Sequence, residues 1–237
     1  MNLDLSRITY YTAAHNGLSI SSCKQLKRAN DVDRVLKIGH ETSKGINFGR
    51  KLLVTSSEPE CETYDFDVEI VKGIDHLEYT RWISENLHQL IDTDFSLNFH
   101  SDGMIQNPSA WTDEFYNYDY IGAIFLRSFV GNGGFSLRSR LFAEVMSQID
   151  MSIHCPQKEN DVDNEDVLFC HTYRDFFEEK GVKYAPLQVA SEFSTESIAT
   201  NPDHFRESFG FHEIERLADP NIINYRRSYM QKILNEY

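Results

Sequence analysis

The stretch that decides the fold is DHLEYTRWISENLHQLIDTDFSLNFHSDG, residues 75–103. Its first part has an apolar stripe at steps of four, four and three residues, which predicts an amphipathic helix over residues 75–91: Tyr79, Ile83, Leu87 and Leu90. The next apolar residues alternate with polar ones, which predicts a strand: Phe95, Leu97 and Phe99. This strand stops at His100-Ser101-Asp102-Gly103. A helix that leads straight into a buried strand is typical of an α/β protein.

The segments on both sides continue the alternation of strands and helices. We expect strands at 7–14, 34–40, 50–57, 67–73, 118–125 and 182–190, and helices at 18–30, 139–149, 164–181 and in the tail from residue 214. This order predicts a Rossmann-like α/β domain with a central, mostly parallel sheet flanked by helices. With no repeat or linker in view, we expect a single domain over residues 1–237. Residues 1–103 would form a half with a nucleotide-fold sheet, and residues 104–237 a second half that decorates it.

Composition narrows the class of protein. The 237 residues are 41% hydrophobic, which allows a sizeable core, and the net charge is −14. That charge disfavours general nucleic-acid binding, although the basic cluster CKQLKR (23–28) could form a local groove or, more simply, one face of a helix. No stretch approaches the roughly 18 apolar residues of a membrane helix, and the N-terminus lacks a signal-peptide pattern. We therefore expect a cytoplasmic protein. The four cysteines are widely spaced and read as ordinary thiols.

The residues that end the central strand have two interpretations. Ligands of open α/β sheets bind at the carboxyl ends of the strands, which is where His100, Ser101 and Asp102 lie. An imidazole and a carboxylate two residues apart could both bind Mn²⁺ or Mg²⁺. Asp102-Gly103 could equally make a turn while His100 fills space. The residues alone support both interpretations.

Two further motifs each have a structural and a functional interpretation. In NEDVLF (164–169), Asn164 could cap a helix whose first turn holds Glu165 and Asp166, or one of these carboxylates could serve as a general base. In VGNGGFSLRSR (130–140), the glycines require positive φ angles or a close approach by a neighbour. A bound ligand or a tight hairpin would explain them. The loop lacks the Walker A lysine and the GxGxxG spacing, and Arg138 and Arg140 could pair with phosphate or with carboxylates.

Taken in order, six motifs carry a resemblance to a known family: HSDG, YDYIGA, VGNGGFSLRSR, NEDVLF, YAPLQVASEFSTE and FGFH. Over residues 75–213 the chain resembles the DUF5672 group of GT-A-type glycosyltransferases. The resemblance implies a GT-A-like fold and a metal-dependent enzyme that moves a sugar from a nucleotide-sugar donor, most simply a UDP-sugar, to a hydroxyl acceptor. The divalent cation would be Mn²⁺ or Mg²⁺.

The resemblance also implies a role for each group of residues. Asp102 would be the main metal ligand, His212 would complete the metal shell, and His100 stands where the family usually has glutamine in a Q-x-D element. Glu165 and Asp166 would supply the carboxylate that deprotonates the acceptor in an inverting reaction. The donor would be bound by a set from four parts of the chain: Tyr11, Thr12, Ala13, Ser101, Asn132, Gly133, Gly134 and Arg138.

Three hypotheses follow. The acceptor is a glycan or polysaccharide precursor, or it is a hydroxymethylated base in DNA, as for phage-type transferases. The third hypothesis is a non-catalytic nucleotide- or sugar-binding module, in which the glycines only make turns and the acids only cap helices.

Overall fold

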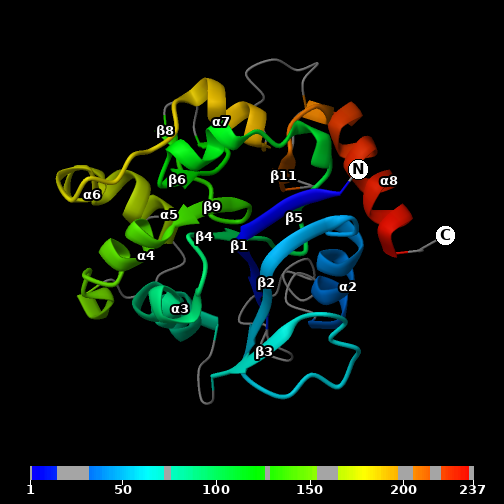
Figure 1. Cartoon of the computed structure of the whole chain (residues 1–237), viewed down its shortest axis with the longest axis horizontal. Coiled ribbons are helices and arrows are strands. Elements are labelled where there is room, and N and C mark those ends of the chain that lie inside the picture. Colours follow the sequence, from blue (N-terminus) through cyan, green and yellow to red (C-terminus); the bar gives the residue numbers. More distant parts are fainter. Residues whose placement is uncertain are drawn as a thin grey trace.

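The computed structural model describes residues 2–14, 32–71, 76–125, 129–153, 165–196, 205–213 and 220–234 (Figure 1). The predicted helix over 18–30, the basic cluster 23–28, Cys23, Cys155 and the cap residue Asn164 lie outside these ranges. The two described cysteines, Cys61 and Cys170, form no disulfide.

The chain alternates strands and helices through its first half and then becomes less regular. The strands are β1 (Leu3–Ala13), β2 (Ile46–Thr55), β3 (Asp67–Ile70), β4 (Phe95–Asn98), β5 (Gly103–Ile105), β6 (Tyr120–Ile121), β7 (Ile124–Phe125), β8 (Phe129–Val130), β9 (Ser136–Ser139), β10 (Ser194–Thr195) and β11 (Gly210–His212). The helices are α2 (Val32–Thr42), α3 (His76–Leu90), α4 (Arg140–Met146), α5 (Glu165–Val167), α6 (Arg174–Glu179), α7 (Leu187–Phe193) and α8 (Pro220–Leu234). A π-helical turn, Leu168–Thr172, joins α5 to α6, and short 3₁₀ turns cover Pro108–Ala110, Asp113–Asn117 and Met151–Ile153.

The central sheet has six strands in the order β3-β2-β1-β4-β9-β6. The pairs β3-β2, β2-β1 and β1-β4 are parallel, and β9 runs antiparallel to both β4 and β6. The predicted α/β class with a mostly parallel, helix-flanked sheet is therefore confirmed. Chain order reverses at β1, whose neighbours are β2 on one side and β4 on the other. The carboxyl ends of β1 and β4 therefore form the edge where doubly wound sheets bind ligands.

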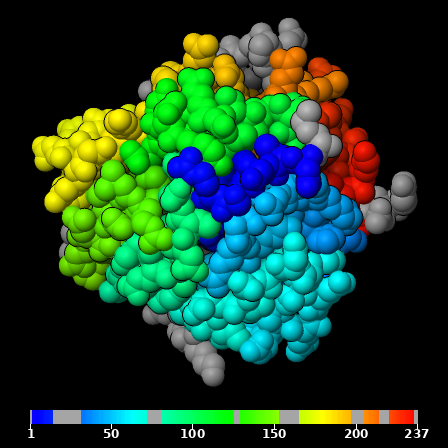
Figure 2. All heavy atoms as spheres, viewed as in Figure 1, coloured from blue at the N-terminus to red at the C-terminus, as the bar shows by residue number. Residues whose placement is uncertain are grey.

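One apolar core holds the two halves of the chain together. It extends from Leu5 on β1 to Phe209 just before β11, and in it Tyr10 stacks on Phe99 with ring centroids 4.2 Å apart. The N-terminal part of β1 reaches the surface, where Asp4 and Arg7 are exposed, while its second part is buried (Figure 2). α2 packs against α8 on one side of the sheet and α3 against α4 on the other (Figure 1). None of the helices in the described ranges is long and apolar enough to cross a membrane.

Two of the predicted strands are wrong. Residues 34–40 lie in helix α2, whose buried residues Val32, Val35, Leu36 and Gly39 recur at helical spacing. Residues 182–190 contain only an isolated bridge from Tyr184 to Tyr120 before helix α7 begins at Leu187. In both segments the residue types favour a strand, but the buried residues recur with a period near 3.6, as they do on one face of a helix.

Other elements are present with different bounds. The predicted strand over 118–125 is two short strands separated by Gly122-Ala123, and the predicted helix over 164–181 is interrupted by the π-helical turn. The glycine cap is confirmed, because Gly181 has a φ of 91° and its N–H donates to the Glu178 carbonyl at 3.0 Å. The helix 75–91 and the strand that follows it correspond to α3 and β4.

A second sheet, in the order β10-β11-β5, lies beside the central one. β10 and β11 are parallel, and β11 is antiparallel to β5. Because β5 follows β4 after a single tight turn, this small sheet joins the ligand edge of the central sheet to the last third of the chain.

Candidate functional site

The residues that end β4 form a tight hairpin turn. The N–H of His100 donates to the Gly103 carbonyl at 2.9 Å, and the N–H of Gly103 donates back to the His100 carbonyl at 3.2 Å. Ser101 and Asp102 are the two residues at the tip of this turn. The turn interpretation is therefore confirmed, and the turn also places the Asp102 carboxylate at the carboxyl edge of the sheet.

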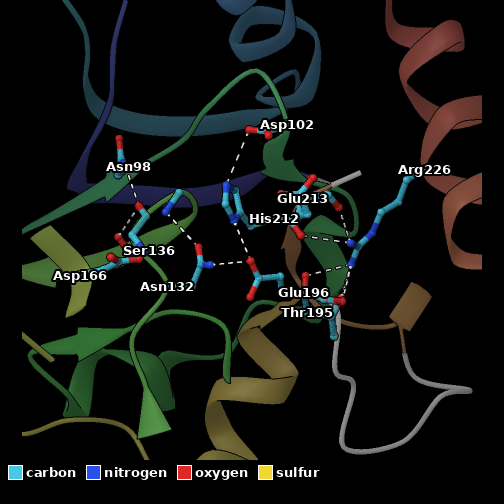
Figure 3. A network of polar contacts seen from close by, with 12 residues as sticks. Asn98, Asp102, Asn132, Ser136, Asp166, Thr195, Glu196, His212, Glu213 and Arg226 are labelled. Atoms are coloured by element: carbon cyan, nitrogen blue, oxygen red, sulfur yellow. Dashed lines mark hydrogen bonds and ion pairs between the residues drawn. The ribbon is translucent and has the colours of Figure 1, made fainter. Parts of the chain in front are cut away.

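The register of the small sheet brings a third side chain to the same place. His212 pairs with Gly103 in the antiparallel β11-β5 ladder, so its imidazole lies beside the hairpin tip. His212 Nε2 is 3.7 Å from Asp102 Oδ1, and Figure 3 shows the two side chains facing each other. The ligand atoms of His100, Asp102 and His212 all lie within 4.8 Å of one another. Residues 112 positions apart in the sequence thus form one cluster.

This cluster has the chemistry and the spacing of a divalent-cation site. Around a cation with ligands at about 2.1 Å, adjacent ligand atoms lie about 3 Å apart and opposite ones about 4.2 Å apart. The 3.7 Å between His212 and Asp102 falls inside that range. Two imidazoles and a carboxylate suit Mn²⁺ well, and the partial exposure of all three side chains leaves room for donor oxygens.

The two histidines differ in how ready they are to bind a cation. Asn98 Nδ2 lies 3.3 Å from His100 Nε2 and donates to the Gly133 carbonyl at 2.7 Å, so Asn98 competes with a cation for that ring nitrogen. Burial, together with the nearby His212, lowers the pKa of His100 to about 4. His100 is therefore a neutral imidazole at neutral pH, but a cation would use its Nε2 only if Asn98 or the ring shifts.

Glu196 lies next to His212, on the side of the ring away from Asp102. No role was predicted from the sequence for this residue. Its Oε1 accepts from His212 Nδ1 at 3.4 Å and from Asn132 Nδ2 at 2.7 Å (Figure 3). A carboxylate on one ring nitrogen leaves the other lone pair free for a metal, which is how outer carboxylates orient metal-binding histidines. Burial lowers the pKa of His212, but the Glu196 hydrogen bond and the Asp102 charge outweigh it, so that the pKa is raised.

The glycines of the 130–140 loop are explained by close approach. In the described ranges only Gly45 and Gly181 have a positive φ among the glycines. A Cβ on Gly134 would lie 2.0 Å from His212 Nε2, and a Cβ on Gly133 would lie 2.5 Å from Glu165 Oε1. Gly133 and Gly134 therefore cannot carry side chains, because Glu165 and His212 occupy that space.

Glu165 is paired with a buried arginine. Arg138 is fully buried on β9, and its Nη2 donates to Glu165 Oε1 at 2.7 Å while its Nε donates to Ser136 Oγ at 3.1 Å. Burial lowers the pKa of Arg138, but the Glu165 charge outweighs it and raises the pKa well above its ordinary value. Glu165 is therefore held in one orientation by a charge-assisted hydrogen bond.

Asp166 has different surroundings. Its Oδ2 accepts from the Gly133 N–H at 3.1 Å and its Oδ1 from the Val167 N–H at 2.9 Å. Burial and the neighbouring Glu165 charge raise the pKa of Asp166 to about 6. Such a carboxylate is ionised at neutral pH yet basic enough to take a proton.

The part of the chain that holds this site matches a family model. The family model described as "Protein of unknown function (DUF5672)" matches residues 60–212, more than half of the chain. This chain belongs to the DUF5672 family. No curated protein matches it in sequence. The match spans His100, Asp102, both members of the acidic pair, Glu196 and His212.

Two solved structures share the fold of this DUF5672 protein. One is a glycosyltransferase involved in the glycosylation of the major capsid of PBCV-1, with 16% identity, a TM-score of 0.53, and coverage of 95% of this chain and 98% of that one. The other is the glycosyltransferase GlyE of Streptococcus pneumoniae TIGR4, with 13% identity and a TM-score of 0.55. That alignment covers 96% of this chain but 62% of GlyE. The fold is therefore one that glycosyltransferases use.

The remaining predicted donor residues lie along the same edge. The side chains of Tyr11 and Thr12 are buried at the end of β1, and Thr12 Oγ1 donates to the Phe99 carbonyl at 2.7 Å. Ala13 is partly exposed at the end of the strand, and Ser101 is buried in the hairpin turn. Asn132 is held by Glu196 and by the Gly134 N–H, which donates to its Oδ1 at 3.0 Å. Contacts of these residues with a donor stay predictions.

Proposed function

We propose that this DUF5672 protein is a metal-dependent glycosyltransferase of GT-A type. It moves a hexosyl or pentosyl group from a nucleotide sugar, most simply a UDP-sugar, to a hydroxyl of a glycan or polysaccharide precursor. The observation that carries the proposal is the cluster of His100, Asp102 and His212 at the carboxyl edge of the sheet, with Asp166 on α5 bound to the Gly133 N–H of the adjacent loop. The shared fold supports it.

The cation ligands are proposed to be Asp102 and His212, with His100 as a third. Mn²⁺ or Mg²⁺ bound there would neutralise the negative charge that builds on the departing diphosphate. Glu196 accepts the Nδ1 proton of His212 and so leaves Nε2 facing Asp102. A cation that displaces the proton from Nε2 would therefore meet a carboxylate oxygen and an imidazole nitrogen at the same point.

Asp166 is proposed as the general base. The acceptor oxygen forms a bond to the anomeric carbon on one face, the bond to the diphosphate breaks on the opposite face, and the hydroxyl proton passes to Asp166. This displacement inverts the anomeric centre. Asp166 suits the task because its pKa is raised to about 6, whereas Glu165 is bound to Arg138. We assign Glu165 to orienting the start of α5, on which Asp166 sits.

The donor would lie along the edge from β1 to the 130–140 loop. Tyr11, Thr12 and Ala13 end β1 where the nucleotide is expected, and Ser101 lies in the hairpin turn beside Asp102. Gly133 and Gly134 would line the donor sugar and acceptor pocket with their backbone, because Glu165 and His212 take the space of their missing side chains. Arg138 contributes its positive charge beneath this surface.

Substitution of Asp102 tests the proposal. Asp102→Ala is expected to lower Mn²⁺-dependent sugar release from a panel of UDP-sugars by at least about a hundredfold, because several kcal/mol of charge stabilisation are lost. Circular dichroism should show an intact fold, since Asp102 is a half-exposed turn residue. Asp94→Ala removes an exposed carboxylate that pairs with Arg7 and is the matched control. Turnover by Asp102→Ala at the wild-type rate, or wild-type turnover that persists in EDTA, would refute the metal assignment.

A further inference from the structure

Helix α8 carries an arginine in the middle of its buried face. Ile222, Arg226, Met230 and Leu234 recur at steps of four, and all four are buried. Met230 and Leu234 pack with Ile38, Met104 and Phe211, so this face of the helix is otherwise apolar. Arg226 itself is fully buried, and its guanidinium carbon lies 4.5 Å from the centre of the Phe211 ring.

The guanidinium joins two backbone segments. Arg226 Nη1 donates to the carbonyls of His212, at 3.0 Å, and of Glu213. Nη2 donates to the carbonyl of Thr195 at 2.9 Å and to its hydroxyl at 3.1 Å, and its contact to the Glu196 carbonyl is 3.5 Å. Figure 3 shows these contacts converging on one side chain that reaches in from the helix.

These two segments are the ones that carry Glu196 and His212. β10 and β11 run parallel, and Thr195 with Phe211 is their last paired position. The pairing of β10 with β11 ends there, so no further hydrogen bond between these two strands fixes the separation of Glu196 and His212, although His212 still pairs with Gly103 on β5. Arg226 binds both strands at the point where they separate, here called the fork, directly behind the Glu196–His212 pair.

The backbone at the fork is also strained. Glu213 has a φ of 70°, in the left-handed region that is unfavourable for a residue with a Cβ. It directly follows His212, and Arg226 binds the carbonyls of both residues. The contact therefore holds the chain in the conformation that sets the direction of the His212 side chain.

Packing alone does not account for an arginine at this position. Removing a guanidinium from water costs several kcal/mol, and an apolar residue would complete the row without that cost. Burial lowers the pKa of Arg226 to about 10, against the opposing charges of Glu196 and Glu213, so the group remains a cation at neutral pH. Its hydrogen bonds go to backbone carbonyls and one hydroxyl of the two segments.

We propose that Arg226 is a positioning residue, which fixes the separation of Glu196 and His212 and thereby presents His212 Nε2 to the cation. The C-terminal helix would then act as the outer support of the metal site. This inference rests on the proposed metal site, and its test separates the two.

The test compares two anchors of α8. Arg226→Met keeps the apolar row but removes the contacts to the two strand ends. Lys37→Met removes the hydrogen bond from Lys37 Nζ to the Leu234 carbonyl (2.8 Å) at the far end of the helix, and is the matched control. Tyr229, whose hydroxyl donates to the Ile105 carbonyl at 2.9 Å, still holds α8 in both variants. Mn²⁺ affinity is measured by electron paramagnetic resonance, and the thermal unfolding of each metal-free variant is recorded alongside it.

We expect Arg226→Met to bind Mn²⁺ about tenfold to a hundredfold more weakly than wild type, and Lys37→Met to bind it as wild type does. Arg226→Lys, which keeps the charge but fewer donors, should fall between and serves if the Met variant does not fold. Equal Mn²⁺ affinity in wild type and all Arg226 variants would overturn the inference and leave the metal site standing. Equal weakening in Lys37→Met would also overturn it, in favour of general stability. Wild-type protein that binds no Mn²⁺ would refute the proposed metal site itself.

Discussion

At the scale of single residues, the two carboxylates Asp102 and Asp166 differ in their surroundings. Asp102 is half exposed at a hairpin tip, with its charge directed at His212. Asp166 is largely enclosed and accepts two backbone N–H groups beside another carboxylate. The first setting leaves a carboxylate open to a cation, and the second favours a group that exchanges a proton near neutral pH. This division underlies the roles that we propose for them.

Asp166→Asn is expected to lower turnover about 10²- to 10⁴-fold and to remove a pH dependence of stability. The folded-state pKa of about 6 lies above the ordinary value of 3.8, so ionisation costs the folded state free energy as the pH rises from about 4 to about 6. Asn does not ionise, so the loss of unfolding free energy between pH 4 and pH 7 should be about 1–3 kcal/mol smaller in the variant, although its amide can accept only one of the two backbone N–H groups that Asp166 binds. Urea unfolding in EDTA at pH 4 and pH 7 and turnover of wild type from pH 5 to 8 provide the measurements.

Wild-type turnover should rise with pH through about 6 and then level off, because the base must be ionised. A flat profile over this range, or an Asp166→Asn variant that is still active, would show that Asp166 is not the base.

The site residues differ in how far the sequence could predict them. The sequence pattern places Asp102 just after a strand and the acidic pair Glu165-Asp166 at the start of a helix. His212 was proposed as a ligand only through the family resemblance. Glu196 has no local signal, since it is one acidic residue after a two-residue strand, and its role depends on a contact with a residue 16 positions away. In the sequence, Arg226 is a charged residue within an apolar helix face and gives no sign of its partners. Neither could be assigned without the pairing of β10 with β11.

At the scale of elements, the register of the pairing between β11 and β5 brings the residues of the metal cluster together. β11 pairs with β5 so that His212 opposes Gly103, and a shift by one residue would direct His212 to the other face of the sheet. The Gly133-Gly134 segment lies against this pair and must be free of side chains. The site therefore depends on a turn, a strand pair and a loop that approach within a few ångströms.

Gly134→Ala is expected to weaken Mn²⁺ binding at least about tenfold, because its Cβ would lie 2.0 Å from His212 Nε2 and displace the imidazole. Gly181→Ala is the control. Gly181 has a φ of 91° with open space around it, so the same substitution should cost about 1 kcal/mol of stability and leave metal binding unchanged. Titration calorimetry with Mn²⁺ and urea unfolding measure the two effects. Unchanged Mn²⁺ affinity in Gly134→Ala would place the cation elsewhere.

The elements themselves were predictable where one period dominates. The helix and strand of residues 75–99 show clear 3.6- and 2-residue periods, and both are present in the fold. The segments 34–40 and 187–190 are short, apolar and rich in β-branched or aromatic neighbours, so composition favours strands there. Tertiary packing overrides it, because each segment must cover a sheet face as a helix.

At the scale of the whole molecule, the order of the strands places the chemistry. Chain order reverses at β1, and the hairpin after β4 opens at that edge. α8 returns from the end of the described chain to support the same edge through Arg226. The net charge of −14 repels polyanions on average, so we favour a glycan hydroxyl over a base in DNA as the acceptor.

The binding of UDP with and without metal tests the central claim most directly. Titration calorimetry of wild type is expected to show one UDP site in the presence of Mn²⁺ and none in EDTA, with Asp102→Ala losing the Mn²⁺-dependent site and Asp94→Ala retaining it. The same UDP affinity in EDTA as in Mn²⁺, or no binding of UDP under either condition, would contradict a cation-held UDP-sugar at this edge of the sheet.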